Sequence, residues 1–160
     1  LHRYGVRVPQ AGERTPVQEP AIDKESQVQR LEHAVAKLPQ VDLNTEHVLI
    51  GGMYARTITI PAGVVLVGAA HKTDHLCVMA GDIEVLTDDG LKRLTGHHVL
   101  ETRAGMKRAG HALAETRWTT ICRTSAATVD EAENDLVDEP ERLQTRTLIP
   151  AAQRTTELEG

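Results

Sequence analysis

The chain has 160 residues, of which 40% are hydrophobic and 26% are charged, so it is long enough for one globular domain with its own core. Its formal net charge is −5, and no run of Lys and Arg is long enough to predict a nucleic-acid partner or a membrane surface. No apolar stretch reaches the length of a membrane span, and we expect no signal peptide. Phe is absent, so we predict a core built from aliphatic side chains.

Two cysteines, Cys77 and Cys122, lie in apolar, strand-like runs. We predict that both are reduced and buried, because a cysteine outside a disulfide is among the residue types most often found inside proteins. A disulfide would require the two strands to face each other. A soluble protein of the cytoplasm fits this pattern best.

Residues 1–22 contain Pro9, Pro16 and Pro20 and show neither helical nor strand periodicity. This composition predicts an extended arm or a disordered segment. Two interpretations stay open, an arm that wraps a partner and a loose terminus.

A helix is predicted from Asp23, which can cap it, to Leu38, after which Pro39 stops it. One narrow apolar stripe runs along this helix, while charged and amide side chains, Glu32 among them, fill its other side. The stripe can pack on the chain's own sheet or pair with another subunit. The stripe consists of Val28, Leu31, Val35 and Leu38.

From Glu46 the pattern changes to short runs of strand type, separated by glycine-rich and proline-containing turns. Alternation places Ile58 and Ile60 on one face, Gly81 is expected to end a strand, and Asp89-Gly90 predicts a hairpin turn. Such a series predicts an all-β sandwich or barrel. The expected strands are 47–50, 54–60, 64–67, 76–80, 82–87, 91–94, a run from 98 and 118–122.

The run Val64–Val67 is apolar on both faces, which is typical of a strand buried between a core and a second surface. That second surface can belong to this chain or to another subunit.

After Ser125 the composition becomes polar again. Thr128 and Glu131 form a capping-box pattern that predicts a short helix to Val137, and Pro140 ends it. Residues 141–160 are expected to form a second arm. The predicted organisation is an N-terminal arm and helix over 1–44, a β-barrel over 45–125, and a short helix and arm over 126–160.

Histidines mark the ends of several of these runs. His71 and His75 are four residues apart and can share a face with Cys77 and Met79, and His111 begins a later strand. We predict that the three imidazoles meet inside the barrel. Three neutral imidazoles suit a divalent transition metal (Fe, Mn, Ni or Zn) and leave coordination positions open for water or substrate. The alternative is that they are hydrogen-bonded histidines of the barrel.

His97 and His98 are adjacent and therefore point to opposite faces of a strand, which makes His98 a weaker candidate for the site. Other side chains are candidates for lining the mouth of the barrel, although charged side chains on barrel strands are more often solvated. The candidates for the pocket lining are His98, Glu101, Arg103, Trp118 and Met79.

The pattern of glycines and histidines resembles the two motifs of the cupin superfamily. The first is carried by Pro61-Ala62-Gly63, His71, Asp74, His75 and Gly81, and the second by Gly96, Ala104-Gly105 and His111. The likeness departs from the family at three places. Ala69 stands where the first histidine is expected, Arg103 replaces a proline, and His111 comes a few residues later than the last histidine of the second motif.

Within that superfamily the chain is most similar to small single-domain cupin-like proteins of tailed bacteriophages, over about residues 45–125. This likeness rests on Asp74-His75-Leu76, Ala104-Gly105 and Trp118-Thr119-Thr120. It implies a cupin-type antiparallel β-barrel (jelly-roll) that binds a divalent metal, with no assignable reaction. Because cupin barrels commonly pair through an outer sheet face, it also implies a homo-oligomer, to which the terminal arms would contribute, and the doubly apolar strand Val64–Val67 supports this expectation. The alternative is a phage structural or assembly protein that uses the barrel as a rigid block, with other virion proteins as partners. It would then be located in the host cytoplasm or in the virion.

Overall fold

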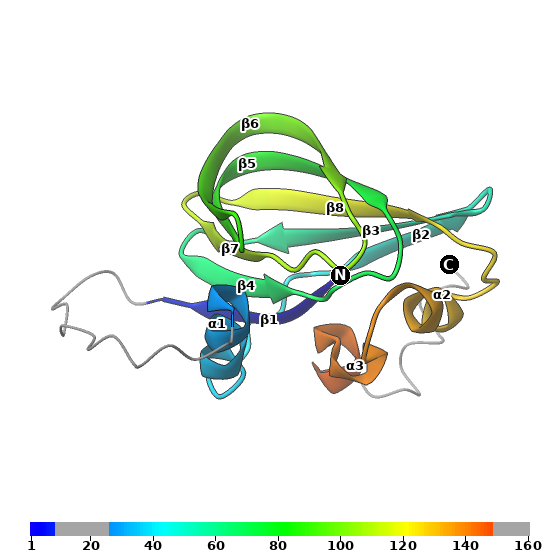
Figure 1. Cartoon of the computed structure of the whole chain (residues 1–160), viewed down its shortest axis with the longest axis horizontal. Coiled ribbons are helices and arrows are strands. Elements are labelled where there is room, and N and C mark those ends of the chain that lie inside the picture. Colours follow the sequence, from blue (N-terminus) through cyan, green and yellow to red (C-terminus); the bar gives the residue numbers. More distant parts are fainter. Residues whose placement is uncertain (9–25, 149–160) are drawn as a thin grey trace, which may run out of the picture.

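The computed structural model describes residues 1–8 and 26–148 (Figure 1). The strands are β1 (His2–Arg7), β2 (Glu46–Ile50), β3 (Met53–Ile60), β4 (Val64–Gly68), β5 (His75–Thr87), β6 (Gly90–Thr102), β7 (Ala109–Ala112) and β8 (Thr116–Arg123). The helices are α1 (Gln27–Val35), α2 (Val129–Leu136), the 3-10 helix η1 (Pro140–Arg142) and α3 (Gln144–Leu148).

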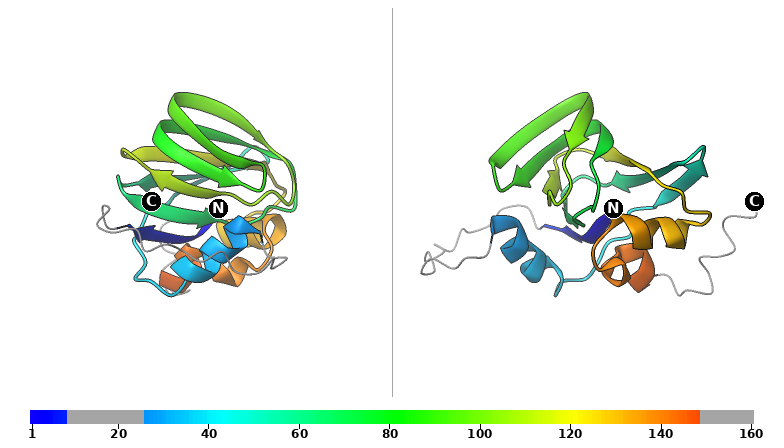
Figure 2. Two further views of the ribbon diagram at one scale, coloured as in Figure 1. Left: turned by 60° about the vertical axis from the view of Figure 1, so that its left-hand side comes forward. Right: turned by 45° about the vertical axis from the view of Figure 1, so that its right-hand side comes forward.

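The eight strands form one antiparallel sheet in the order β1-β4-β7-β5-β8-β3-β2, with β6 paired to β5. The sheet curls around an interior, and the helices gather on one side of it (Figures 1 and 2). This architecture confirms the predicted all-β class, with an N-terminal helix and short C-terminal helices. Within the described ranges, no helix is long and apolar enough to cross a membrane.

The interior of the sheet holds an aliphatic core, as the absence of Phe predicts. Along β3, every second side chain from Tyr54 to Ile60 is buried, because successive side chains of a strand point to opposite faces. The central cluster includes Ile58, Ile60, Val64, Met79, Ile83, Val85 and Leu94.

Gly81 does not end a strand, contrary to the prediction. It lies within the long strand β5, where the neighbour of β5 changes from β8 to β7. Its φ is +149°, and a Cβ at this position would lie 2.7 Å from Thr116 Cα. The glycine thus permits a close backbone approach where the sheet changes partner.

The N-terminal segment was predicted to be an arm, but His2–Arg7 form the edge strand β1, which pairs with β4. Val65 and Val67 of β4 pack against Val6 and, from α1, Val28 and Val35. The second surface that covers the doubly apolar strand is therefore part of this chain. The helix packs on its own sheet, which was one of the two interpretations.

Helices α1 and α2 each begin after a capping side chain. The described part of α1 begins after Ser26 rather than at Asp23, which lies outside the described residues, and Ser26 and Gln29 complete a capping box. Thr128 caps α2 by accepting from the backbone N–H of Glu131, as predicted. Beyond α2, η1 and α3 pack against the body of the protein where a second arm was expected, and residues 149–160 lie outside the described residues.

Candidate functional site

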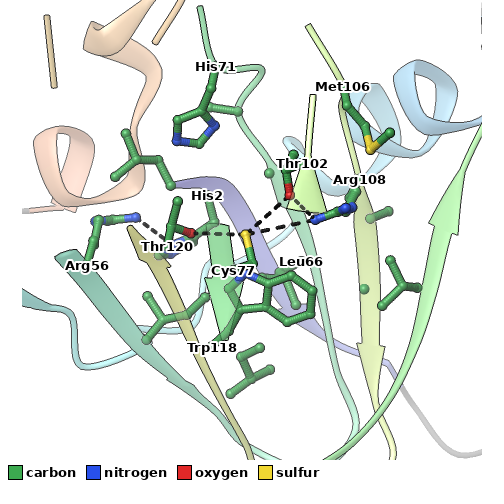
Figure 3. A pocket seen from close by; sticks show the side chains of 18 of the residues that line it. His2, Arg56, Leu66, His71, Cys77, Thr102, Met106, Arg108, Trp118 and Thr120 are labelled. Atoms are coloured by element: carbon green, nitrogen blue, oxygen red, sulfur yellow. Dashed lines mark hydrogen bonds between the residues drawn. The ribbon is translucent and has the colours of Figure 1, made fainter. Parts of the chain in front are cut away.

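A cavity of about 70 Å³ lies inside the curled sheet. Its walls come from β1, β3, β4, β5, β6, β7 and β8 and from the segment that leads into β7 (Figure 3). A buried water occupies about 10–15 Å³ of such space, so the cavity has room for about five waters or a small ligand. No Asp or Glu is among the lining residues. The polar lining residues include His2, Arg56, His71, His75, Cys77, Thr102, Arg108 and Thr120.

The strand register sorts the interior into a polar row and an apolar row. Arg56 pairs with Thr120, and Thr120 pairs with Cys77, so these three side chains form a row across β3, β8 and β5. The next row along the same strands consists of Ile58, Trp118 and Met79. Because both rows face inward, the cavity has a polar end and an apolar end.

Arg56 is fully buried at the polar end, with 2% of its surface exposed. It donates to His2 Nδ1 at 3.2 Å, and two further contacts, to threonine hydroxyls, are long at 3.5 Å. His2 Nε2 lies 2.7 Å from Gln144 Oε1. Because a guanidinium only donates, His2 accepts at Nδ1 and donates at Nε2. Strands β1 and β3 and helix α3 therefore position this guanidinium together.

Arg56 has no carboxylate within ion-pair distance among the described residues. Burial lowers its pKa, and the charge of Glu133 is among the influences that oppose this shift. Glu133 is itself paired with Arg146 Nε at 2.9 Å. The Nε of Arg56 has no hydrogen-bond partner. A buried cation without a bonded anion is costly, which makes this arginine the most unusual residue of the cavity.

A second guanidinium reaches the cavity from the segment before β7. Arg108 Nη1 donates to Thr102 Oγ1 at 2.7 Å and lies 3.9 Å from Cys77 Sγ, and its Nη2 donates to the Glu101 carbonyl at 3.2 Å. Its guanidinium carbon is 6.0 Å from the centre of the Trp118 ring. Figure 3 shows Arg56 and Arg108 on opposite sides of Cys77. The two cations therefore flank the polar row.

His71 and His75 lie together at the same end, as predicted. Their ring centres are 4.1 Å apart. The backbone of His71 is fixed because its carbonyl accepts from the Gly105 N–H at 2.8 Å and because it forms a bridge with Val137. His75 donates from Nδ1 to the Thr73 carbonyl at 3.0 Å. Burial lowers the pKa of His71 well below its usual value, so this ring is neutral, and its Nε2 has no hydrogen-bond partner.

Cys77 shares the inner face with His75, and both predicted cysteines are buried and free. Burial raises the pKa of the Cys77 thiol, but hydrogen bonding to His75 and Thr102 outweighs it and lowers the pKa to about 6. Burial raises the pKa of Cys122 to about 11. The polar end of the cavity therefore favours negative charge on sulfur, whereas the site of Cys122 opposes it.

His111 does not join the other two histidines. It lies opposite Val65 and Glu84 in the sheet, and its Nδ1 is 3.5 Å from a carboxylate oxygen of Glu84 on the outer face. The alternation of β7 sends the neighbouring Gly110 towards the cavity and His111 away from it. The expected convergence of three rings is therefore a convergence of two.

The other predicted lining residues divide between the two faces of the sheet. Trp118 lines the cavity, and Met79 is fully buried in the core beside it. His98 is half-buried and contacts the Thr95 carbonyl through Nε2 at 2.9 Å. Glu101 and Arg103 are exposed and contact each other, so these three residues do not line this cavity.

The donor atoms present do not fit a three-ligand metal centre. Among the described residues, no group of three or more His, Cys, Asp or Glu side chains is arranged to hold a metal ion. Sites for transition metals with an open position commonly have three protein ligands. His71 and His75 supply two imidazoles, and no carboxylate lines the cavity.

Three important residues were not predicted. Arg56 had a readable signal, because alternation places it on the same face as Ile58 and Ile60. His2 lies in a segment that was expected to be an arm, and Arg108 follows a turn with no periodicity. The sequence offered no signal for these last two, because only the tertiary fold brings them to the cavity.

Neither known protein families nor curated proteins show a match to this chain. Solved structures, in contrast, show matches to this chain. A cupin-2 domain protein from Shewanella frigidimarina has 12% identity and a TM-score of 0.43, over 58% of this chain and 91% of that one. A cupin superfamily protein from Desulfitobacterium hafniense has 11% identity and a TM-score of 0.44, over 57% and 86%. Ectoine synthase from P. lautus has 15% identity and a TM-score of 0.43, over 52% and 65%. Two of these three are described as cupins.

Proposed function

We propose that this protein is a cupin-type module that binds a small molecule inside its curled sheet. The observation that carries the proposal is the cavity, in which apolar walls surround a few convergent polar groups. Ligand sites in proteins commonly have this composition. Two buried side chains, Arg56 and His71, keep nitrogen atoms without partners beside this space. Such groups are expensive to bury unless a water or a ligand satisfies them.

The single tryptophan supplies the test, because Trp118 lines the cavity. We expect small organic molecules to change its fluorescence in a saturable way and to raise the melting temperature in the same order of affinity. Ile58→Phe, which adds volume at the apolar end, should abolish the response. Val99→Phe on the exposed outer face is the matched control and should leave it intact. A response that survives Ile58→Phe in a folded protein contradicts binding in this cavity.

A divalent metal, as predicted from the sequence, stays a prediction for the same end of the cavity, since His71 Nε2 is free to accept a further contact. Elemental analysis after exposure to Fe, Mn, Ni and Zn tests it. Less than about a tenth of an ion per chain argues against a site coupled to folding. Binding that is lost in His71→Ala and retained in His111→Ala would assign the ion to the pair.

The second candidate function is that of a structural module, including the role in a phage particle predicted from the sequence. The observation that favours it is an exposed apolar area on the outer face. Val48, Leu76 and Val99 are 55%, 45% and 61% exposed, and Ala55 and Ile121 connect Val48 to Leu76 across the sheet. Exposed apolar patches mark association surfaces. Light scattering should then show a homo-oligomer that Leu76→Lys dissociates, and a monomer at all concentrations contradicts this candidate.

A further inference from the structure

We propose that the ligand of the cavity is a small organic monocarboxylic acid in its anionic form. Its carboxylate would lie at the polar end beside Arg56 and Arg108, and its short apolar body would lie against Ile58 and Trp118. This inference rests on the proposed function and names the chemical class of the ligand.

The charge of the cavity is the first argument. Two guanidinium groups reach it, and no Asp or Glu lines it. Arg56 is 2% exposed and has no carboxylate within ion-pair distance among the described residues. An anion bound beside it would replace the solvation that burial removes. Arginine also suits a carboxylate, because its planar group can donate two parallel hydrogen bonds to the two oxygens.

The second argument is the unused donor at the polar end, the Nε of Arg56. The Nε of Arg56 and the Nε2 of His71 are both buried without a partner, and His71 is only 4% exposed. Figure 3 shows the His71 ring above Thr120 in this view. The backbone of Ala69 accepts a hydrogen bond from the His71 ring, so the neutral ring carries its proton on Nδ1 and its Nε2 is an acceptor that does not contact the carboxylate. The hydroxyl group of Thr120 provides a further donor at the same end.

The surroundings of Cys77 also favour a negative charge at the polar end of the cavity. Hydrogen bonding lowers the pKa of the Cys77 thiol to about 6, although burial alone raises it. The polar end thus stabilises a negative charge on one of its own side chains. The two guanidinium groups, together with the lack of a carboxylate in the lining, favour an anion independently of the pKa of Cys77.

The shape of the cavity selects among anions. The row of Ile58, Trp118 and Met79 lies directly beside the row of Arg56, Thr120 and Cys77. A ligand with an apolar body and one charged end matches these two rows, whereas inorganic phosphate leaves the apolar row without a partner. The volume of about 70 Å³ limits the body to a few carbon atoms.

Matched small molecules test the inference on the full chain. Isobutyrate, its neutral amide isobutyramide, and inorganic phosphate are titrated in a chloride-free buffer while Trp118 fluorescence and the melting temperature are followed. We expect isobutyrate to bind about tenfold or more tightly than isobutyramide, because hydrogen bonds to charged groups contribute more than neutral ones. Phosphate should bind more weakly than isobutyrate.

Variants locate the charge that is responsible. Arg56→Met and Arg108→Gln should each reduce the preference for isobutyrate over isobutyramide by about tenfold. The second variant keeps the test valid if the first does not fold, because Arg108 is only half-buried. Arg103→Gln is the matched control, since Arg103 is exposed and paired with Asp74 outside the cavity. It should leave the preference unchanged.

The possible outcomes separate the two proposals. If isobutyramide binds as tightly as isobutyrate, the cavity binds ligands but the inference of an acid is overturned. If phosphate binds more tightly than isobutyrate, the apolar row does not select the ligand and the inference fails. If none of the three molecules changes either signal, both proposals fail. Retention of the isobutyrate preference in every folded Arg56 and Arg108 variant also overturns the inference.

Discussion

Two buried arginines of this protein have opposite surroundings. Arg3 on β1 is 4% exposed and contacts carboxylate oxygens of Glu32 at 3.0 Å and Glu139 at 3.3 Å. Arg56 is 2% exposed and contacts none among the described residues. Both keep an Nε without a hydrogen-bond partner, so the carboxylates make the difference. A buried cation with its own anions holds the fold together, whereas one without them is available to a ligand.

The surroundings of Arg3 explain how α1 is fixed to the sheet. Glu32 of α1 accepts from Arg3, contacts Arg142 at 3.5 Å, and also pairs with Lys107. These cations come from β1, from the segment after α2 and from the segment before β7. One carboxylate therefore connects three parts of the chain that are far apart in sequence.

The largest effect is expected for Glu32→Gln, which removes the buried carboxylate that Arg3 shares with Lys107 and Arg142. We expect the free energy of unfolding to fall by about 3–5 kcal/mol, as for other broken buried ion pairs. Urea denaturation measures it. Glu46→Gln is the matched control, because Glu46 pairs with Arg117 on the surface and should cost less than about 1 kcal/mol. Equal costs for the two variants would show that Glu32 is not a structural anchor.

The pH dependence of stability should distinguish the two regions. Burial lowers the pKa of both His2 and His71 near Arg56, so these rings stay neutral in the folded protein while they bind protons near pH 6.5 when it unfolds. The unfolded state then holds more protons, and the free energy of unfolding falls as the pH drops below about 6.5. At helix α1, burial raises the pKa of Glu32, but pairing with Lys107 and Arg3 outweighs burial and lowers this pKa below 4.5. The stability that ionised Glu32 contributes is therefore lost only in more acidic solution.

His71→Gln should therefore flatten the stability profile between pH 6.5 and 5. The slope should decrease by up to about 1.4 kcal/mol per pH unit, which corresponds to one proton. Glu32→Gln should reduce stability throughout that window without changing the slope. Urea denaturation at several pH values measures both. An unchanged slope in His71→Gln would mean that this ring takes up its proton equally in both states.

Sequence periodicity predicted most of the strands and the inner face of β3, but it missed β1 and divided β5 at Gly81. The same alternation that places Ile58 and Ile60 inside also places Arg56 there, so the inward position of Arg56 could be predicted from the sequence. The partners of Glu32 were not, because they approach from three segments distant in sequence. Glu32 was accordingly expected on the solvated side of its helix.

The histidine prediction succeeded where local spacing decides and failed where register decides. His71 and His75 flank the start of one strand, so four residues of spacing fix their proximity. The face of His111 depends on how the short strand Ala109–Ala112 pairs with β4 and β5. A shift of one residue reverses every side chain of a strand, and the sequence around His111 does not specify that choice.

A smaller effect is expected for Arg56→Met than for Arg3→Met. Removing the guanidinium at position 56 relieves the cost of burying an unpaired charge, while His2 Nδ1 loses its donor at a cost of about 1–3 kcal/mol. The net change in the free energy of unfolding should stay within about 2 kcal/mol. Arg3→Met removes one partner of a buried pair and should cost more. Urea denaturation compares them, and an equal or larger loss in Arg56→Met would make Arg56 a structural residue.

The smallest effect is a spectroscopic difference between the two cysteines, which reports on the charge at the two positions without altering the fold. In Cys122→Ala, the ultraviolet absorption of the thiolate of Cys77 should appear with a midpoint near pH 6, because hydrogen bonding from His75 and Thr102 outweighs burial. In Cys77→Ala, Cys122 should stay protonated throughout the neutral range, because burial raises its pKa to about 11. Thr102→Val in the Cys122→Ala background removes one of the hydrogen bonds and should move the midpoint to higher pH. If the two thiols titrate together, the row of Arg56, Thr120 and Cys77 does not favour negative charge. The lack of a carboxylate beside Arg56 would then not make the cavity prefer anions.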